Sequence, residues 1–245
     1  MKYIFANWKM NKSLAEAMAF SQEIKKLKFK NVIPIICSPV IYLSELSKVL
    51  TGSNVKLAAQ NIAAWDNGPY TGEISARQLA PFCQYAIIGH SERKIYLNEN
   101  LDLISKKINQ AINNKIIPLV CLGENEAEKA SGKSQAIIKE QWQIISKNIN
   151  KPGPDNLMLV YEPEWAISTA KDNQGVGDTP ENAQAMHQFL KGLTENKFPI
   201  IYGGSVKPEN CASYIDKKEI DGALVGGASL DLASFIEILK LVENA

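Results

Sequence analysis

Short apolar runs recur along the whole chain and alternate with longer segments of helical periodicity. The runs are Tyr3–Ala6, Val32–Cys37, Val55–Ala59, Tyr85–Ile88, Ile116–Leu122, Leu157–Tyr161, Pro199–Tyr202 and Gly222–Val225. In each of them apolar residues follow one another directly instead of occupying every second position. This pattern predicts strands that are buried on both faces.

The segments between several of these runs have apolar residues at helical spacing. Ser13 is a suitable N-cap for a helix that runs through Leu27, and Thr179-Pro180 predicts the start of another helix. Further helices are expected over 101–112, 136–149 and 235–242. Strands that alternate with helices favour parallel pairing with right-handed crossovers.

Eight such units in 245 residues fit a closed (β/α)8 barrel better than an open sheet. An open doubly wound sheet would normally carry a Gly-rich dinucleotide turn after its first strand, whereas this strand continues as Ala6-Asn7-Trp8-Lys9. No break in composition indicates a linker. We therefore expect a single barrel domain over residues 1–245.

The composition changes this picture little. With 45% hydrophobic residues, 22% charged residues and a net charge of +1, the chain gives no indication of a nucleic-acid or membrane surface. The first residues read as a strand and not as a signal peptide. The four cysteines form no CxxC pair, which predicts reduced thiols, no zinc site and a cytoplasmic location; they are Cys37, Cys83, Cys121 and Cys211.

The carboxyl ends of the strands form the active site of such a barrel. Glu162 ends the sixth strand, and Pro163 stops that strand because it has no amide hydrogen. A loop of small and polar residues follows as far as Thr179. A lone carboxylate beside such a loop is the arrangement expected of a general base under a lid. An acid that merely caps a neighbouring amide fits this pattern equally well.

Three other polar residues follow predicted strands. His90 precedes Ser91 at a helix start, where the dipole keeps an imidazole neutral and able to donate a hydrogen bond. Lys9 is placed to neutralise an anion, and Asn7 is placed to hold this lysine or to contact a substrate oxygen. His90 as a structural residue and Lys9 as a surface lysine remain alternatives. The second histidine, His187, is expected to be structural or exposed within a helix.

Two glycine pairs follow the last two strands. Gly203-Gly204-Ser205 and Gly226-Gly227 let backbone amides approach an anion, and the loops after these strands are the usual phosphate position in a barrel. Simple tight turns are the alternative. A phosphate site at these glycine pairs, combined with Glu162 as base and with His90 and Lys9 beside an enolate oxygen, indicates a specific reaction. This reaction is proton abstraction next to a carbonyl on a small phosphorylated molecule. This chemistry needs no metal and no cofactor, and we expect none.

Several segments, in their order along the chain, closely resemble the triosephosphate isomerase family. They are Asn7-Trp-Lys9-Met-Asn11, Gln60-Asn61, Gly68–Ser75, Ile88–Arg93, Cys121–Glu124, Tyr161–Pro163, Trp165–Ile167, Tyr202–Val206 and Leu224–Ser229. The resemblance implies interconversion of dihydroxyacetone phosphate and glyceraldehyde 3-phosphate through an enediolate, a step of glycolysis and gluconeogenesis. A neutral histidine and a closing loop are known features of that family, which the resemblance also supplies.

The resemblance also implies roles for individual residues. Glu162 matches the base, His90 the neutral electrophile, and Lys9 the lysine that supports the oxyanion. The substrate-binding positions of the family match Asn7, Lys9, Ser168, Ser205, Gly226 and Gly227. Its supporting positions match Glu92, Tyr202 and Gly204.

The family implies a homodimer in which a loop of each subunit inserts near the lysine of the other. Thr71 matches the tip of this loop, and Gly72 and Glu73 follow it. A long loop in a compact barrel needs some partner, although a flexible surface loop would have a similar sequence.

The chain departs from the family in the predicted lid. Ser168 and Ala170 stand where glycines are usual, Glu164 replaces an apolar residue, and 172–178 is longer and more polar. A non-glycine residue restricts φ, so we expect these departures to affect loop closure rather than the chemistry.

Two other functions are alternatives for a chain of this kind. Another phosphosugar isomerase or epimerase on this fold is expected to bring metal ligands or different acids at the strand ends. A non-catalytic barrel is expected to lack the base or the histidine, and this chain has both Glu162 and His90.

Overall fold

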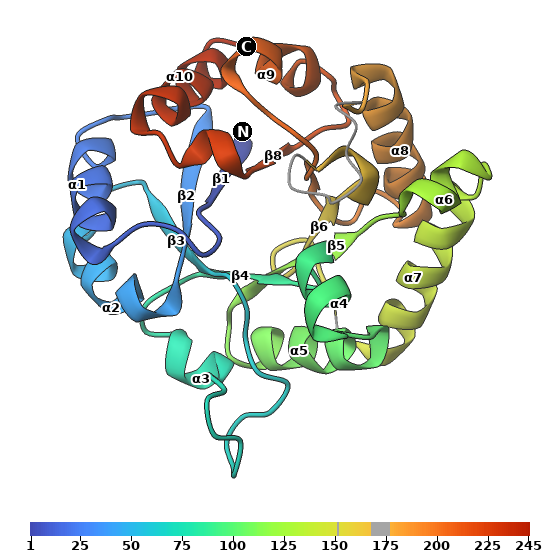
Figure 1. Ribbon diagram of the computed structural model, residues 1–245, viewed down its shortest axis with the longest axis horizontal. Helices are drawn as coiled ribbons and strands as arrows, with labels where there is room; N and C mark the ends of the chain where they lie inside the picture. Colours follow the sequence, from blue (N-terminus) through green and yellow to red (C-terminus); the bar gives the residue numbers. More distant parts are fainter. Residues whose placement is uncertain (151, 168–176) are drawn as a thin grey trace.

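Eight parallel strands close into a barrel in the computed structural model, which describes residues 1–150, 152–167 and 177–245 (Figure 1). Each strand pairs with the next one along the chain, and β1 also pairs with β8. The strands are β1 (Lys2–Asn7), β2 (Val32–Ser38), β3 (Lys56–Ala59), β4 (Tyr85–Ile88), β5 (Ile117–Leu122), β6 (Met158–Tyr161), β7 (Ile200–Tyr202) and β8 (Gly222–Val225). The predicted closed (β/α)8 barrel is confirmed. That the chain is a single domain stays a prediction.

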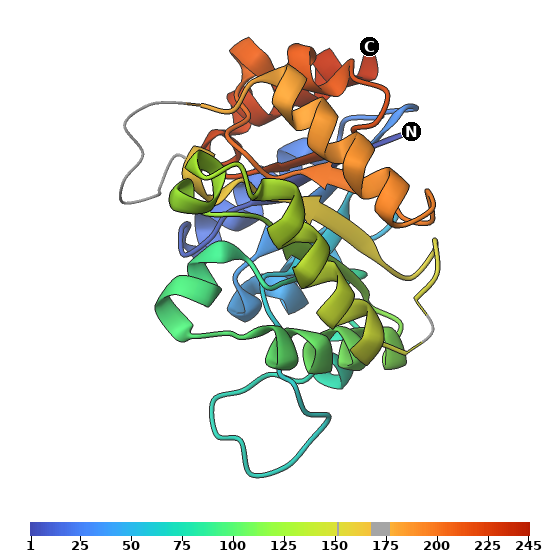
Figure 2. The ribbon, with the colours of Figure 1, turned by 90° about the vertical axis from the view of Figure 1, so that its right-hand side faces the viewer.

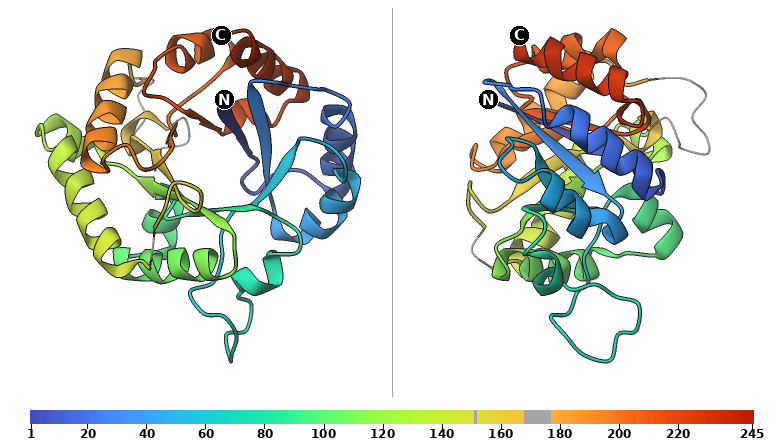
Figure 3. Two further views of the ribbon diagram at one scale, coloured as in Figure 1. Left: turned by 180° about the vertical axis from the view of Figure 1, so that it is seen from behind. Right: turned by 90° about the vertical axis from the view of Figure 1, so that its left-hand side faces the viewer.

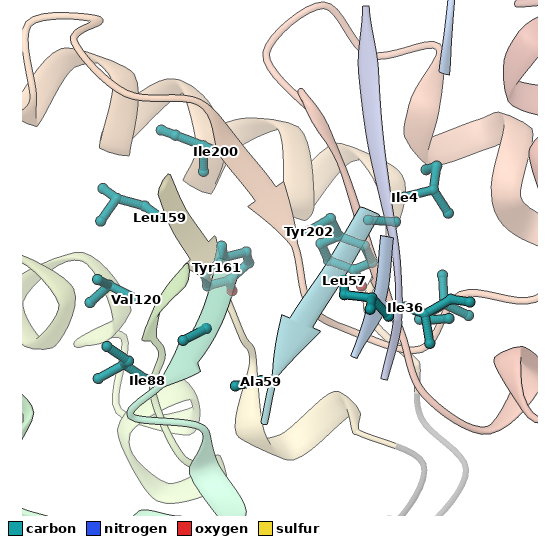
Figure 4. Close-up of a cluster of buried hydrophobic side chains, with 14 of the residues drawn as sticks. Ile4, Ile36, Leu57, Ala59, Ile88, Val120, Leu159, Tyr161, Ile200 and Tyr202 are labelled. Carbon is teal, nitrogen blue, oxygen red and sulfur yellow. The ribbon is translucent and has the colours of Figure 1, made fainter. Parts of the chain in front are cut away.

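Both faces of the strands are buried, as their continuous apolar runs predict. Ile4, Ile36 and Leu159 belong to the large cluster between the strands and the helices, part of which Figure 4 shows. Their neighbours Phe5 and Ile35 point the opposite way and belong to a second cluster. Because successive side chains of a strand point to opposite faces, this second cluster fills the barrel interior.

Helices surround the barrel, and every helix predicted from periodicity is present. A capping box between Ser13 and Glu16 starts α1, which ends at Ile24 and not at the predicted Leu27 because the chain turns at Lys25 and Lys26. These helices are α1 (Leu14–Ile24), α5 (Leu101–Asn113), α7 (Ser134–Asn148), α8 (Pro180–Leu193) and α10 (Leu232–Glu243). The helix start expected at Ser91 is confirmed by α4 (Ser91–Leu97). The sequence did not predict α2 (Val40–Val49), α3 (Ala76–Leu79), α6 (Glu126–Ala130), α9 (Pro208–Ile215), η1 (Glu164–Ala166) and η2 (Gly227–Ser229).

The loop between β3 and α3 projects away from the barrel (Figure 2). Both ends of the chain lie at the face of the barrel opposite α4, and this face is turned toward the viewer in the left view of Figure 3. No helix in the described part of the chain is long and apolar enough to cross a membrane.

Candidate active site

The carboxyl ends of four strands surround a pocket of about 270 Å³. Asn7 and Lys9 reach it from β1, and His90 reaches it from the end of β4. The turns after β7 and β8 line the rest, so the pocket contains most of the residues predicted for the site. Those turns contribute Gly203, Gly204, Ser205, Gly226 and Gly227.

Glu162 lies next to this pocket but does not line it. Its side chain is only 1% exposed and accepts hydrogen bonds from the backbone N–H of Ser91 (3.0 Å) and from the Ser91 hydroxyl (2.7 Å). The Nε2 atom of His90 is 3.2 Å from Glu162 Oε1. The backbone of Glu162 lies directly against Gly123, which only a glycine allows, because a Cβ there would lie 1.8 Å from the Glu162 carbonyl oxygen. The sequence predicted no role for Gly123, and it predicted Ser91 only as the start of a helix, not as a partner of Glu162.

His90, and not Ser91 at the expected helix start, is the N-cap of α4. The backbone N–H of Glu92 donates to His90 Nδ1 at 3.2 Å. A nitrogen that accepts a hydrogen bond carries no proton, so this contact fits a neutral ring with its proton on Nε2. The Nε2–H of His90 points toward Glu162 and the pocket, where a substrate oxygen can accept a hydrogen bond from it.

Lys9 is held in place by three neighbours. Its backbone has a φ of 52°, and its N–H donates to Asn7 Oδ1 at 3.1 Å. The Gln60 side chain donates to the Lys9 carbonyl at 2.9 Å, and Lys9 Nζ forms an ion pair with Glu92 at 2.5 Å. Asn7 therefore holds the lysine, which is one of the two roles considered for it. Gln60 had been recognised only as part of a shared segment.

The glycine turns are shaped by close packing. A Cβ on Gly204 would lie 2.2 Å from the Tyr202 hydroxyl, and a Cβ on Gly203 would lie 2.7 Å from Val160. By contrast, a Cβ on Gly227 would meet nothing within 4 Å, so Gly227 leaves open space at the pocket. Small residues at these positions let an anion approach the backbone amides.

The Tyr202 hydroxyl donates to the carboxylate of Asp178 at 3.3 Å. Burial raises the pKa of Asp178 to about 6, although the Asn182 side chain and the Thr179 backbone N–H both donate to its carboxylate and lower the pKa. Tyr202 is fully buried, and burial followed by the charge of Asp178 raises its pKa far above the usual value. Tyr202 therefore supports the Gly203–Gly204 turn from within the protein.

A larger cavity of about 790 Å³ lies on the other side of Lys9 and His90. Asn11 and Gln60 line it, as do Gly72 and Glu73 of the projecting loop. Large apolar side chains around it are exposed; they include Met10, Val40, Ile41, Ile74, Tyr96 and Leu97. Thr71 lies in the projecting loop and is exposed.

Other predicted positions have mixed outcomes. His187 is buried, and burial lowers its pKa to about 3, so the exposed alternative was wrong. Ser168 and Ala170, with most of the 172–178 segment, lie outside the described residues. Within residues 1–150, 152–167 and 177–245, no group of three or more His, Cys, Asp or Glu side chains is arranged to hold a metal ion. The absence of a metal or cofactor stays a prediction.

Comparisons with known proteins agree with this arrangement. The family model described as Triosephosphate isomerase matches residues 2–242. Proteins named triosephosphate isomerase from Alkaliphilus metalliredigens and Mycoplasma mobile are each 39% identical to this chain. The alignments cover 97% of this chain and 98% of the first protein, and 98% of this chain and 99% of the second. The protein of that name from Cupriavidus necator is 38% identical over 97% of this chain and 98% of its own.

Proposed function

The chain belongs to the triosephosphate isomerase family, and we propose that it interconverts dihydroxyacetone phosphate and D-glyceraldehyde 3-phosphate by proton transfer through an enediolate. One observation carries the assignment of roles within this chain. A buried carboxylate, Glu162, lies 3.2 Å from the imidazole of His90 at the edge of a pocket lined by glycine turns.

In the proposed step, Glu162 removes a proton from the hydroxymethyl carbon next to the carbonyl of dihydroxyacetone phosphate. The electron pair of that C–H bond forms the carbon–carbon double bond, and the carbonyl π electrons move to the oxygen. The His90 Nε2–H donates to this oxygen and the Lys9 ammonium compensates its charge. His90 gives its Nε2 proton to this oxygen and takes the proton of the hydroxyl on the neighbouring carbon, so that the proton moves between the two oxygens and the imidazole is neutral again. Glu162 then returns its proton to the former carbonyl carbon, the other carbon–oxygen bond becomes the aldehyde, and Glu162 is ionised again.

The phosphate is bound at the opposite end of the pocket from the base in this proposal. Ser205, Gly226 and Gly227 line the pocket, and backbone amides of such turns favour an anion. A phosphate held there fixes the distance between the reacting carbons and Glu162. The pocket volume of about 270 Å³ suits a three-carbon phosphate.

We also propose a homodimer in which Thr71, Gly72 and Glu73 of one subunit enter the other near Lys9. The support is the cavity of about 790 Å³ beside Lys9 and the exposed apolar side chains around it, such as Met10 and Ile41, which are 98% and 74% exposed. An apolar surface of this kind is typical of an interface. A cytoplasmic location is part of the same proposal, supported by four free, buried cysteines.

The proposal is tested by a coupled assay on glyceraldehyde 3-phosphate without added metal, comparing wild type with Glu162→Gln. Glutamine keeps the shape and can still accept from Ser91, but it cannot take a proton at neutral pH. Loss of about 10⁴-fold or more in kcat, with folding unchanged by circular dichroism, supports the proposal. An active glutamine variant, or an inactive wild type that is folded and dimeric, contradicts it.

A further inference from the structure

Two acidic side chains on either side of Pro163 are both attached to the same helix. Glu162 accepts from the backbone and hydroxyl of Ser91 in the first turn of α4. One turn further along α4, Lys94 forms an ion pair with Glu164 at 2.6 Å. The strand end that carries the base is therefore fastened to α4 at two points.

The second attachment is partly shielded from solvent. The side chains of Lys94 and Glu164 are 18% and 17% exposed, whereas exposed ion pairs of the chain such as Lys26–Glu23 are more than half exposed on both sides. Burial opposes the charge of Lys94, but Glu164 and then Glu162 outweigh it and raise the pKa of this lysine. Salt and water screen a partly buried ion pair less than an exposed one, so the attraction between its two charges is stronger.

The base has to leave its present position in order to act. Glu162 is 1% exposed, is bound to Ser91 and His90, and does not line the pocket. Where the backbone of Glu162 shifts together with its carboxylate, the fixed φ of Pro163 passes this shift on to Glu164. Any contact that fixes Glu164 therefore adds to the free-energy cost of that movement.

Building on the proposed function, we propose that the Lys94–Glu164 ion pair is a positioning device that holds Glu162 in its withdrawn, Ser91-bound position. Neither Lys94 nor Glu164 is among the described residues that line the pocket. It acts by favouring one of two positions of the segment that carries the base. Its removal lowers the cost of bringing Glu162 into the pocket, and ligands that require the advanced base bind more tightly.

The test uses Glu164→Gln, which removes the charge and keeps the size of the side chain. The probe is 2-phosphoglycolate, a phosphorylated carboxylate that imitates the charge of the enediolate. We expect its dissociation constant to fall by about 3- to 10-fold, with a parallel fall in KM and a smaller change in kcat. Lys94→Met should have the same effect, and the double variant should show no further gain, because both changes break one interaction.

The matched control is Glu23→Gln, which breaks a pair of the same 2.6 Å length on the exposed surface. It should leave the dissociation constant and KM unchanged. A purely structural role of the Lys94–Glu164 pair would lower the free energy of unfolding and leave ligand affinity unchanged, and that result overturns the proposal. Weaker binding in Glu164→Gln, or additive effects in the double variant, also overturn it. If instead both wild type and variants bind 2-phosphoglycolate but are inactive, the proposed function fails separately.

Discussion

His90 Nε2 lies 3.2 Å from Glu162 Oε1, so the hydrogen-bond donor and the base of the proposed reaction contact each other directly. A substrate that receives a hydrogen bond from His90 and gives a proton to Glu162 has to separate these two groups. The hydrogen bond from the Glu92 backbone to Nδ1 keeps the imidazole oriented while this happens. His90 therefore keeps its donor available without a change of tautomer.

Replacing His90 by glutamine should reduce kcat by about 10²- to 10³-fold, because an amide does not place its N–H where the imidazole does. KM should change much less, because the phosphate contacts are intact. Steady-state kinetics in both directions of the reaction check this. A variant in which KM rises and kcat is unchanged would mean that His90 only binds substrate.

Lys9→Met should lower kcat/KM by about 10²-fold, because the charge that compensates the enediolate is lost. Glu92→Gln is the matched comparison, since it keeps the lysine charge and removes only its 2.5 Å partner. We expect a loss of less than about tenfold for Glu92→Gln. Equal losses in the two variants would show that the ion pair, and not the cation beside the substrate, matters for activity.

Gly123→Ala should abolish most of the activity and destabilise the protein, because its Cβ would lie 1.8 Å from the Glu162 carbonyl oxygen, a backbone atom that has no room to move. Gly192→Ala within α8 is the control, because its Cβ would meet nothing within 4 Å. Alanine there should raise the free energy of unfolding by up to about 1 kcal/mol. Similar urea midpoints for the two variants would contradict this account of the base's backbone.

Asp178 makes stability depend on pH. Its pKa is about 6 in the folded protein against a usual value of 3.8, since burial disfavours the charged form. Its contribution to stability is therefore fully present below 3.8 and is lost as the pH rises through about 6. At pH 8 the ionised form costs on the order of 3 kcal/mol.

Asp178→Asn removes this cost and keeps an acceptor for the Thr179 N–H. The variant should be more stable than wild type by about 1–3 kcal/mol near pH 8, and the advantage should disappear toward pH 4. Urea unfolding at one fixed protein concentration across this range checks the prediction. A difference that does not vary with pH would rule out Asp178 as its source.

Sequence reasoning predicted the barrel because the apolar runs are continuous and alternate with helical segments, and each strand lies within one residue of its expected bounds. It also placed Asn7, Lys9, His90 and the glycine turns at one end of the barrel, because parallel strands all end on the same side. The contacts of Glu162 with Ser91 and of Lys94 with Glu164 join residues more than 60 positions apart. Periodicity carries no information on such contacts, since they depend on how α4 and the end of β6 approach each other.

The central claim is that a proton leaves the carbon of the substrate and is held by Glu162. It is tested most directly by converting glyceraldehyde 3-phosphate in D₂O and analysing the dihydroxyacetone phosphate by proton NMR, for wild type and for Glu162→Gln. The account predicts deuterium on the carbon of the wild-type product, because the protonated base exchanges with solvent, and no enzyme-dependent exchange in the variant. Product formed by wild type without any carbon-bound deuterium would indicate direct hydride transfer and contradict the account, as would undiminished exchange in the variant.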